Sequence, residues 1–119
     1  MPRDADLAWA AGFIDGEGCV AVDSRKSPRI TVSNTDRRPL DRLQELLGGT
    51  ICVHGRGNPE KGHRPSWVWA VHGGRSVRRV LAEVRPYLVV KGEQADLVLA
   101  AAPGSTSLKQ ALVEARRAA

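Results

Sequence analysis

The chain has 119 residues, 42% of them hydrophobic, and this size predicts one domain over residues 1–119 with enough apolar surface for a compact core. Its formal net charge of +5 favours a polyanionic partner, although an ordinary solvated basic surface would carry the same charge. The two cysteines are few, lie far apart and form no CxxC pair, which excludes a disulfide framework or a cysteine zinc site. Neither a signal peptide nor an apolar run of membrane-spanning length is visible. We therefore expect a soluble intracellular protein (cytoplasmic, nucleoid-associated or organellar) without a membrane partner.

The first part of the chain predicts a helix followed by a hairpin. The helix covers residues 6–18, and Asp4 or Asp6 can cap it. The next residues alternate between apolar valines and small or polar side chains, and a period of two indicates a half-buried strand. A turn over 24–28 and a second alternation over 29–33 complete an antiparallel hairpin.

A second helix and a second hairpin follow. A capping cluster at 34–36 starts a helix with leucines at helical spacing, which ends at Gly48. The second hairpin begins at Ile51 and returns over 67–71, with a glycine-rich, basic tip over 55–62. The two tryptophans of the returning strand could stack on bases, but their spacing of two residues favours core positions.

The remaining segments predict helices. One has apolar residues at helical spacing over 77–84 and is ended by Pro86, the next covers 95–101, and Ser105 or Ser107 caps a final helix. The predicted order is therefore α-β-β-α-β-β-α-α-α, an α+β fold.

The first helix ends in an unusual way. Its last turn holds Asp15 and Glu17, although a helix C-terminus carries negative partial charge and disfavours each carboxylate by about 0.3–1 kcal/mol. We expect Asp15 to steady the turn that ends the helix. Glu17 is then either a surface acid beside this turn or a ligand for a cation.

Three small residues, Ala8, Gly12 and Gly16, share one face of the same helix. An internal glycine costs about 1 kcal/mol relative to alanine, which is reasonable where another backbone must approach closely. If the approaching helix belongs to a second copy related by a two-fold axis, the two Glu17 carboxylates converge and repel each other. A hard cation such as Mg²⁺ would turn this repulsion into ligation, so we expect a homodimer interface at these three residues.

The stretch AAGFIDGEG over residues 10–18 resembles the signature of the LAGLIDADG homing endonucleases, with alanine for the first leucine and glutamate for the last acid. A second stretch, RPYLVVKGEQADL over 85–97, is similar to the recurrent block in which a strand-end lysine precedes a Gln-Ala-x-Leu helix. The likeness extends over most of the chain and is weakest over 55–66 and after Pro103. It implies an αββαββα fold with C-terminal helices and a four-stranded antiparallel saddle sheet that binds DNA. Because only one such motif occurs, it implies the homodimeric type.

This resemblance implies a site-specific endonuclease that hydrolyses both strands of duplex DNA at a long, near-palindromic target and leaves short 3′ overhangs, in the service of intron or intein mobility. Glu17 and the Gly16 carbonyl would bind Mg²⁺ or Mn²⁺. Lys91 would stabilise developing negative charge or orient water, and Asn34 would be a further polar catalytic residue. The residues by themselves also allow Lys91 to be a solvated loop lysine and Asn34 to be a helix cap.

Outward positions of the strands would form the DNA-binding face, because a curved sheet can enter the major groove and contact base edges. We expect DNA contacts from Arg25, Arg29, Thr31, Ser33, His54 and Arg56. Each of these arginines could equally be solvated. The acid Asp23 shares the face, as do small or weakly polar side chains at Cys19, Ala21, Thr50, Cys52, Val68 and Ala70. Other basic residues would neutralise the DNA backbone: Arg37, Arg38, Lys61, Arg64, Arg75, Arg78 and Arg79. The three scattered histidines predict neither a zinc site nor a histidine-based nuclease.

Two other classes of function stay open. The same fold could act as a catalytically decayed DNA-binding regulator or as an RNA maturase, and RNA would be a partner only in the second case. A small basic structural domain could also use its glycine helix only to dimerise. The presence of Glu17 and Lys91 argues for catalysis, because a pure binder gains nothing from an acid that faces phosphate.

Overall fold

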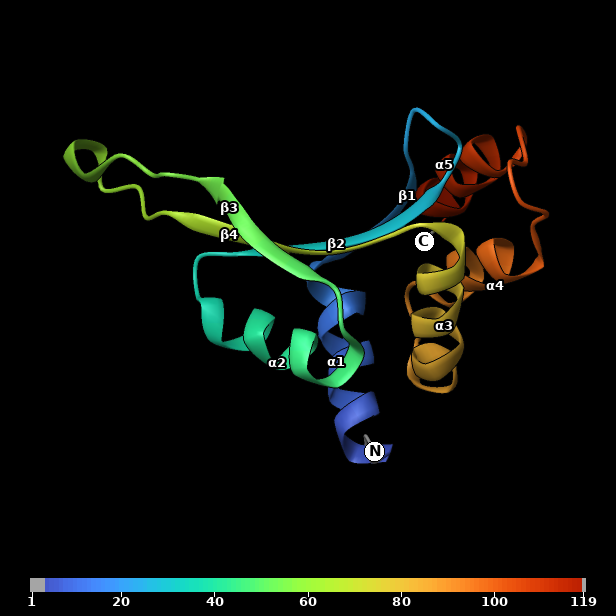
Figure 1. Cartoon of the computed structure of the whole chain (residues 1–119), viewed down its shortest axis with the longest axis horizontal. Coiled ribbons are helices and arrows are strands. Elements are labelled where there is room, and N and C mark those ends of the chain that lie inside the picture. Colours follow the sequence, from blue (N-terminus) through green and yellow to red (C-terminus); the bar gives the residue numbers. More distant parts are fainter. Residues whose placement is uncertain (1–3, 119) are drawn as a thin grey trace.

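The computed structural model describes residues 4–118 and has two layers, a curved antiparallel sheet and a set of helices below it (Figure 1). The elements are α1 (Asp4–Glu17), β1 (Gly18–Val22), β2 (Pro28–Asn34), α2 (Arg37–Leu47), β3 (Thr50–Gly55), β4 (Ser66–His72), α3 (Gly74–Val84), α4 (Gly92–Ala100) and α5 (Leu108–Ala118). The strand order is β1-β2-β4-β3, so the second strand of each hairpin lies in the centre. The predicted α+β fold and element order are confirmed.

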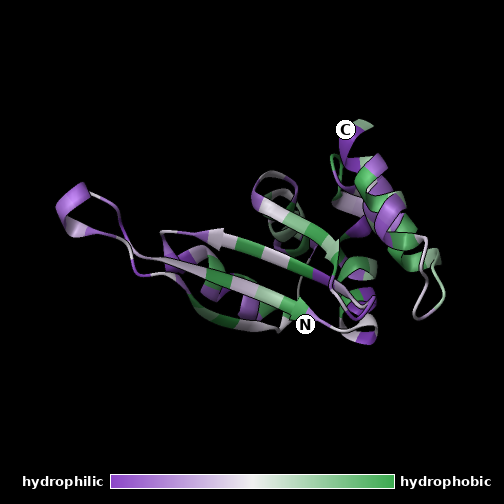
Figure 2. Cartoon of the chain, turned by 90° about the horizontal axis from the view of Figure 1, so that it is seen from above, coloured by the Kyte–Doolittle hydropathy of each residue, from purple (hydrophilic) through white to green (hydrophobic). Residues whose placement is uncertain are grey.

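The helices α1, α2 and α3 lie against one face of the sheet, and the opposite face of β2, β3 and β4 is left open (Figure 1). Apolar residues recur at every second position of the strands, which Figure 2 shows as alternating bands. In the register of the sheet, Val32 lies opposite Trp69 and Ile30 opposite Val71, and all four are buried on the helical side. Burial of each such side chain contributes about 1.5–3 kcal/mol, which fixes the register because a one-residue slip would expose all of them.

Trp69 confirms the prediction that the strand tryptophans belong to the core. Its ring is fully buried, and its Nε1 donates a hydrogen bond of 2.8 Å to the carbonyl of Gly48, at the end of α2. The next residue, Gly49, has φ +91°, and a Cβ there would lie 2.7 Å from the Ala70 carbonyl oxygen. The paired glycines therefore let the chain leave α2 and pass close over β4. Trp67 is partly buried against the same core.

The β3–β4 hairpin extends beyond the helices as a projecting arm (Figure 1). Its tip is a 3₁₀ turn, η1 (Pro59–Lys61), whose N-cap Asn58 accepts a hydrogen bond from the Glu60 N–H at 3.1 Å. Val53 lies on the helical side of the alternation at the base of this arm, yet it is 61% exposed. The helical layer therefore ends before the arm begins.

Several boundaries differ from those predicted. Within the described residues α1 already includes Asp4 and Asp6 in its first turn, where the helix dipole favours acids, so neither is the residue before the helix. The segment before Lys91 is not a strand but a 3₁₀ turn, η2 (Arg85–Tyr87), followed by a bend. Ser107 immediately precedes α5, as predicted, although its hydroxyl contacts the Ser105 hydroxyl at 3.2 Å. Across residues 4–118 no helix has both the length and the apolar character needed to span a bilayer.

Candidate active site and nucleic-acid interface

Glu17 is the last residue of α1, and Gly18 begins β1 directly after it. The Glu17 side chain is exposed and makes no hydrogen bond or ion pair with any residue of 4–118. The last turn of α1 contains no basic residue. The carboxylate thus adds negative charge to the negative end of the helix dipole without a basic residue in that turn, a cost that a bound cation would offset.

Asp15 has a different role in the same turn. Its carboxylate accepts hydrogen bonds from two backbone N–H groups, those of Val89 at 2.7 Å and Lys91 at 2.9 Å. Such charge-assisted bonds fix the bend that leads into α4. The structural duty predicted for Asp15 is confirmed, but the turn that it steadies is 74 to 76 residues away in the sequence.

Lys91 reaches back to α1. It is the N-cap residue of α4, where a cation is disfavoured, but its Nζ donates a hydrogen bond of 2.7 Å to the Asp15 carbonyl oxygen. The ammonium therefore lies at the C-terminal end of α1, where the dipole favours positive charge. The fold therefore brings Lys91 to the same helix end as Glu17, which follows Asp15 by two residues in the sequence.

The oxygen donors at this helix end match what a hard divalent ion takes. Glu17 supplies an exposed carboxylate, and Gly16 is exposed beside it with a backbone carbonyl in the last turn. No cluster of three or more His, Cys, Asp or Glu side chains suited to a metal occurs among residues 4–118. One protomer thus offers part of a coordination shell, and a second Glu17 would add to it.

Asn34 lies at the end of β2, and its side chain is already engaged. Its Oδ1 accepts a hydrogen bond of 2.8 Å from the Asp36 N–H, and Asp36 is the N-cap of α2. Asn34 is therefore not the helix cap that the sequence also allowed, and its side chain instead forms an Asx-type turn that leads into the cap. Only the amide nitrogen of Asn34 is left to donate to a ligand.

The glycine face of α1 is bare. Ala8, Gly12 and Gly16 are exposed, whereas the buried residues Ala10, Ala11 and Ile14 face the core. A Cβ added at Gly12 or Gly16 would meet nothing within 4 Å. No contact within residues 4–118 therefore explains why these positions are glycine. Close to the same helix end, Val89 is 84% exposed and Val90 is 53% exposed.

The open face of the sheet carries the residues predicted for it at regular register positions. Arg29 on β2 lies between Ala21 and His72, and the next row on this face has Thr31 between Cys19 and Ala70. The third row places Ser33 opposite Val68, which in turn lies opposite Cys52. Arg29 and His72 therefore stand near the β1–β2 turn, and the other rows carry hydroxyl groups among small or weakly polar side chains.

Three predicted DNA-binding residues do not lie in these rows. Arg25 is in the turn between β1 and β2, where its N–H donates to the Asp23 carboxylate at 2.9 Å. Arg56 follows the end of β3, on the projecting arm. His54 is the extra residue at an irregularity of the β3–β4 register, and bulges of this kind redirect side chains. All three are exposed.

Sequence reasoning missed His72. It is exposed, pairs with Arg29 across the β2–β4 register, and stands on the open face. The alternation of outward residues Val68, Ala70 and His72 would have predicted its position if the returning strand had been extended by one residue.

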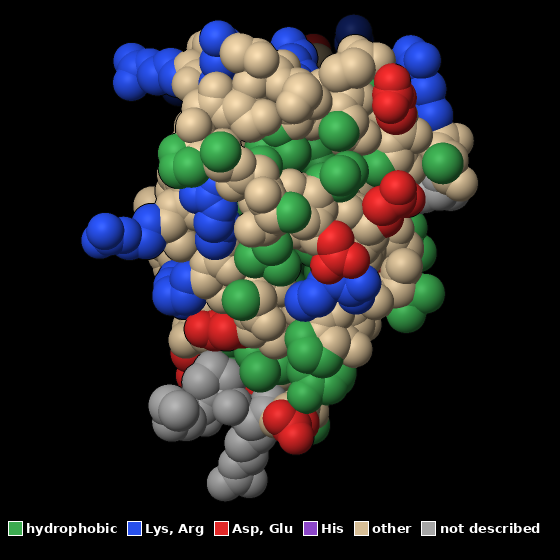
Figure 3. All heavy atoms as spheres, turned by 90° about the vertical axis from the view of Figure 1, so that its right-hand side faces the viewer, with side chains coloured by type: hydrophobic (Ala, Val, Ile, Leu, Met, Phe, Trp, Pro, Cys, Tyr) green, Lys and Arg blue, Asp and Glu red, His purple; other side chains and the backbone are tan. Residues whose placement is uncertain are grey.

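The side of the molecule formed by α3, α4 and α5 differs from the open sheet face, because basic, acidic and apolar side chains are mixed there (Figure 3).

Comparison with known proteins agrees with this architecture. A family model described as a LAGLIDADG-like domain matches residues 4–85. The DNA endonuclease I-CvuI of Chlorella vulgaris is 32% identical over an alignment of 106 residues, gaps included, and the match covers 78% of this chain and 61% of that protein. The chain therefore spans less than two thirds of the length of this curated relative.

Solved structures give the same result. The crystal structure of I-CvuI with a DNA target in the presence of Mg superposes with a TM-score of 0.64 at 31% identity, over 82% of this chain and 67% of the other. The archaeal intron-encoded I-Vdi141I, in complex with DNA, has a TM-score of 0.69 at 19% identity, over 99% of this chain and 86% of the other, a similarity of fold alone. On the evidence of the family match over residues 4–85, this chain belongs to the family of LAGLIDADG-like domains.

Proposed function

We propose that two copies of this chain form a metal-dependent endonuclease that cuts duplex DNA at a long, near-palindromic target. The observation that carries the proposal is the end of α1, where the ammonium of Lys91 lies at the same helix end as Glu17, which is exposed and has no ion pair within residues 4–118. The relative I-CvuI is named a DNA endonuclease and was crystallised with DNA targets in the presence of Mg and of Ca.

The bare face of α1 supports the dimer. Ala8, Gly12 and Gly16 form a stripe without side-chain bulk, so a symmetry-related α1 can approach with close backbone contact. In that arrangement the C-terminal ends of the two helices converge. Each protomer then brings one Glu17 and one Lys91 to the axis, and each set serves one DNA strand.

Glu17 and the Gly16 carbonyl would hold Mg²⁺, or Mn²⁺, with waters in the remaining positions. When bound, such an ion makes a water nucleophilic and stabilises the attacking and leaving oxygens of an in-line displacement. The acid here is a glutamate, whose side chain is one methylene longer than aspartate, so the carboxylate reaches farther from the helix end.

Lys91 acts on the phosphate that is attacked. One of its three N–H donors is used on the Asp15 carbonyl, which leaves two for the non-bridging oxygens as their negative charge grows. Asp15 positions this lysine by fixing the backbone at residues 89 and 91. The Asn34 amide nitrogen is the further polar donor that we assign to the site. The Oδ1 of the same side chain accepts a hydrogen bond from the Asp36 N–H, which sets the orientation of the amide group.

The open sheet face would lie in the major groove, where each base pair shows a distinct pattern of donors and acceptors. Arg29, Thr31 and Ser33 on the central strand β2 contact base edges in this arrangement, and His54 joins them from β3. Arg25 and Arg56 stand beyond the rows, one at the turn and one on the arm, so we assign them to backbone phosphates.

The deciding experiment selects cleaved sites from a randomised duplex library with Mg²⁺, with an EDTA control. We expect an enriched site with near two-fold symmetry, cut in Mg²⁺ and intact in EDTA. Glu17→Gln should abolish cutting and keep duplex binding. Sequence-specific binding without cutting in the wild type would instead indicate a DNA-binding regulator, and preference for folded intron RNA over duplex would indicate a maturase.

A further inference from the structure

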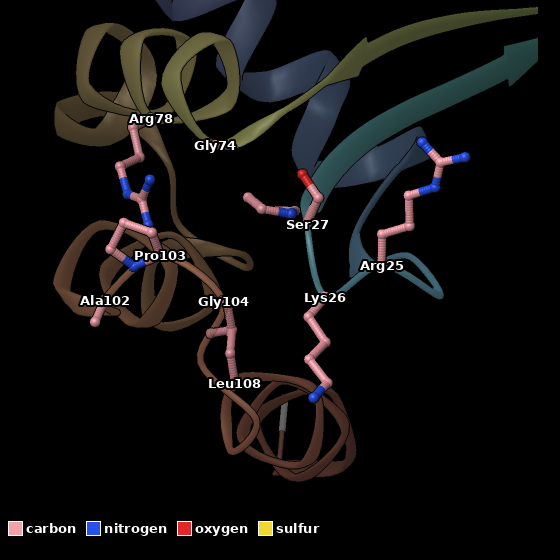
Figure 4. Close-up of a pocket in the computed structure, with 10 residues that line it drawn as sticks. Arg25, Lys26, Ser27, Gly74, Arg78, Ala102, Pro103, Gly104 and Leu108 are labelled. Atoms are coloured by element: carbon pink, nitrogen blue, oxygen red, sulfur yellow. The ribbon is translucent and has the colours of Figure 1, made fainter.

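A cavity of about 140 Å³ lies between the β1–β2 turn, the start of α3 and the loop that joins α4 to α5 (Figure 4). Its lining residues are Arg25, Lys26, Ser27, Pro28, Gly74, Arg78, Ala102, Pro103, Gly104 and Leu108. The cavity is separate from the end of α1 and uses none of the residues assigned to cleavage.

The lining contains three cations and no acid. Within residues 4–118 neither Arg25, Lys26 nor Arg78 has an ion pair with a carboxylate. Five other arginines each have such a partner: Arg37, Arg38, Arg42, Arg79 and Arg85. Other arginines of residues 4–118 also lack such a partner, so the missing ion pairs alone do not mark the site. What marks it is that basic side chains line one concave space together and no acid lines it with them.

Arg78 is held in place on one wall. Its guanidinium donates a hydrogen bond of 2.9 Å to the Ala101 carbonyl, and a Cβ on Gly74 would lie 2.6 Å from its other terminal nitrogen. The guanidinium therefore covers the first turn of α3, and its remaining N–H groups are available. In Figure 4 Arg78 and Lys26 lie on opposite sides of the cavity, whereas the Arg25 side chain turns away from it.

Lys26 has an unfavourable backbone conformation at the position where it lines the cavity. Its φ is +63°, the left-handed region that glycine and asparagine adopt more readily. The hairpin turn is held in this form by the Asp23 carboxylate, which accepts from the N–H groups of Arg25 and Ser27. The turn thus puts a lysine, and its cationic side chain, on the lining of the cavity.

We propose that this cavity binds a phosphate group of the duplex backbone, at the end of the sheet opposite the arm. The proposal rests on the proposed DNA-cleaving function. The β1–β2 turn rises on the same side as the open face, and the arm projects at the far end, so a duplex along the face reaches both (Figure 1). Phosphate oxygens then accept from Lys26 and Arg78, and the neighbouring start of α3 adds positive potential.

The first test uses inorganic phosphate and needs no DNA. Phosphate is titrated into ¹⁵N-labelled protein at constant ionic strength, and we expect saturable amide shifts at Lys26, Ser27, Gly74 and Gly104. In Lys26→Asn, which keeps the left-handed turn, the affinity should fall about tenfold, as expected for loss of one charge-assisted hydrogen bond. Arg117→Gln at the end of α5 removes the same charge outside the cavity and should leave the shifts unchanged.

The second test compares duplex DNA binding of the same variants over a range of salt concentrations. Lys26→Asn should weaken binding of every sequence alike and reduce the salt slope by about one, whereas Arg117→Gln should change neither. Shifts that do not saturate, or that are equal in Lys26→Asn, would overturn the site. If phosphate binds in the cavity but the DNA salt slope is unchanged in Lys26→Asn, the phosphate that binds there does not come from the duplex backbone. A wild type that ignores duplex DNA but binds phosphate in the cavity would refute the proposed function and retain the anion site.

Discussion

Replacement of Gly12 by alanine separates two effects at the exposed face of α1, the helix propensity within one protomer and the packing between two. In one protomer the new methyl group meets nothing within 4 Å, so it adds only helix propensity. Gly→Ala in a helix interior stabilises by about 1 kcal/mol, which corresponds to a rise in Tm of roughly 3–6 °C for a chain of this size. In the proposed dimer the same methyl group would enter a contact between two backbones, where overpacking costs about 1–3 kcal/mol.

We therefore expect Gly12→Ala to stabilise the protomer and weaken the dimer at the same time. Sedimentation equilibrium would measure a dimer dissociation constant raised by about tenfold, and thermal unfolding at concentrations where the protein is monomeric would show the higher Tm. Ala82→Gly, at an exposed site in α3, calibrates the propensity effect and should lower the Tm by a similar amount without changing association.

Gly18 provides a contrasting case in the same motif. A Cβ there would lie 2.7 Å from the Ile14 carbonyl oxygen, so Gly18→Ala should destabilise the protomer itself. If Gly12→Ala raised the Tm and left the dissociation constant unchanged, the glycine stripe would not be an interface and the shared site at the end of α1 would have no physical basis.

Four further outcomes test the site and the fold. Lys91→Met should abolish cutting while duplex binding stays within a fewfold of the wild type, measured by single-turnover cleavage and by gel shift; a matching loss of binding would refute its placement at the attacked phosphate. Arg29→Ala should relax sequence preference at one base pair in each half-site by about 1–3 kcal/mol, read from site selection, and a uniform loss over all positions would make it a phosphate contact. Trp69→Phe leaves the Gly48 carbonyl without its donor and should cost about 1–3 kcal/mol in urea unfolding, and an unchanged midpoint would contradict the role of that hydrogen bond. The hydrogen bonds from Arg38 lower the pKa of Asp36 from 3.8 to about 2, so its stabilising contribution is present above pH 3.8 and is lost as the pH falls toward 2; Asp36→Asn should flatten the stability curve in that window.

Local periodicity determined most of the fold. The alternation around Val20 and Val22 predicted β1, and helical spacing of leucines predicted α2 up to Gly48, because burial of one face is a property of neighbouring residues. The unfavourable acid at Glu17 and the glycines that nothing in the helix explains were also visible in the sequence. They pointed to the end of α1 and, through the resemblance, to the family.

Contacts between distant segments could not be predicted in this way. The hydrogen bond that the Asp15 carboxylate accepts from the backbone N–H at residue 91 joins positions 76 apart. The resemblance named Lys91, but its local sequence showed only a lysine before a helix, at the end where that helix dipole disfavours a cation. The cavity around Arg78 likewise exists only because the β1–β2 turn, α3 and the α4–α5 loop meet. Periodicity reports which face of an element is buried, whereas the packing of whole elements decides which polar groups share a site, and for this chain that packing placed the lysine ammonium at the end of α1.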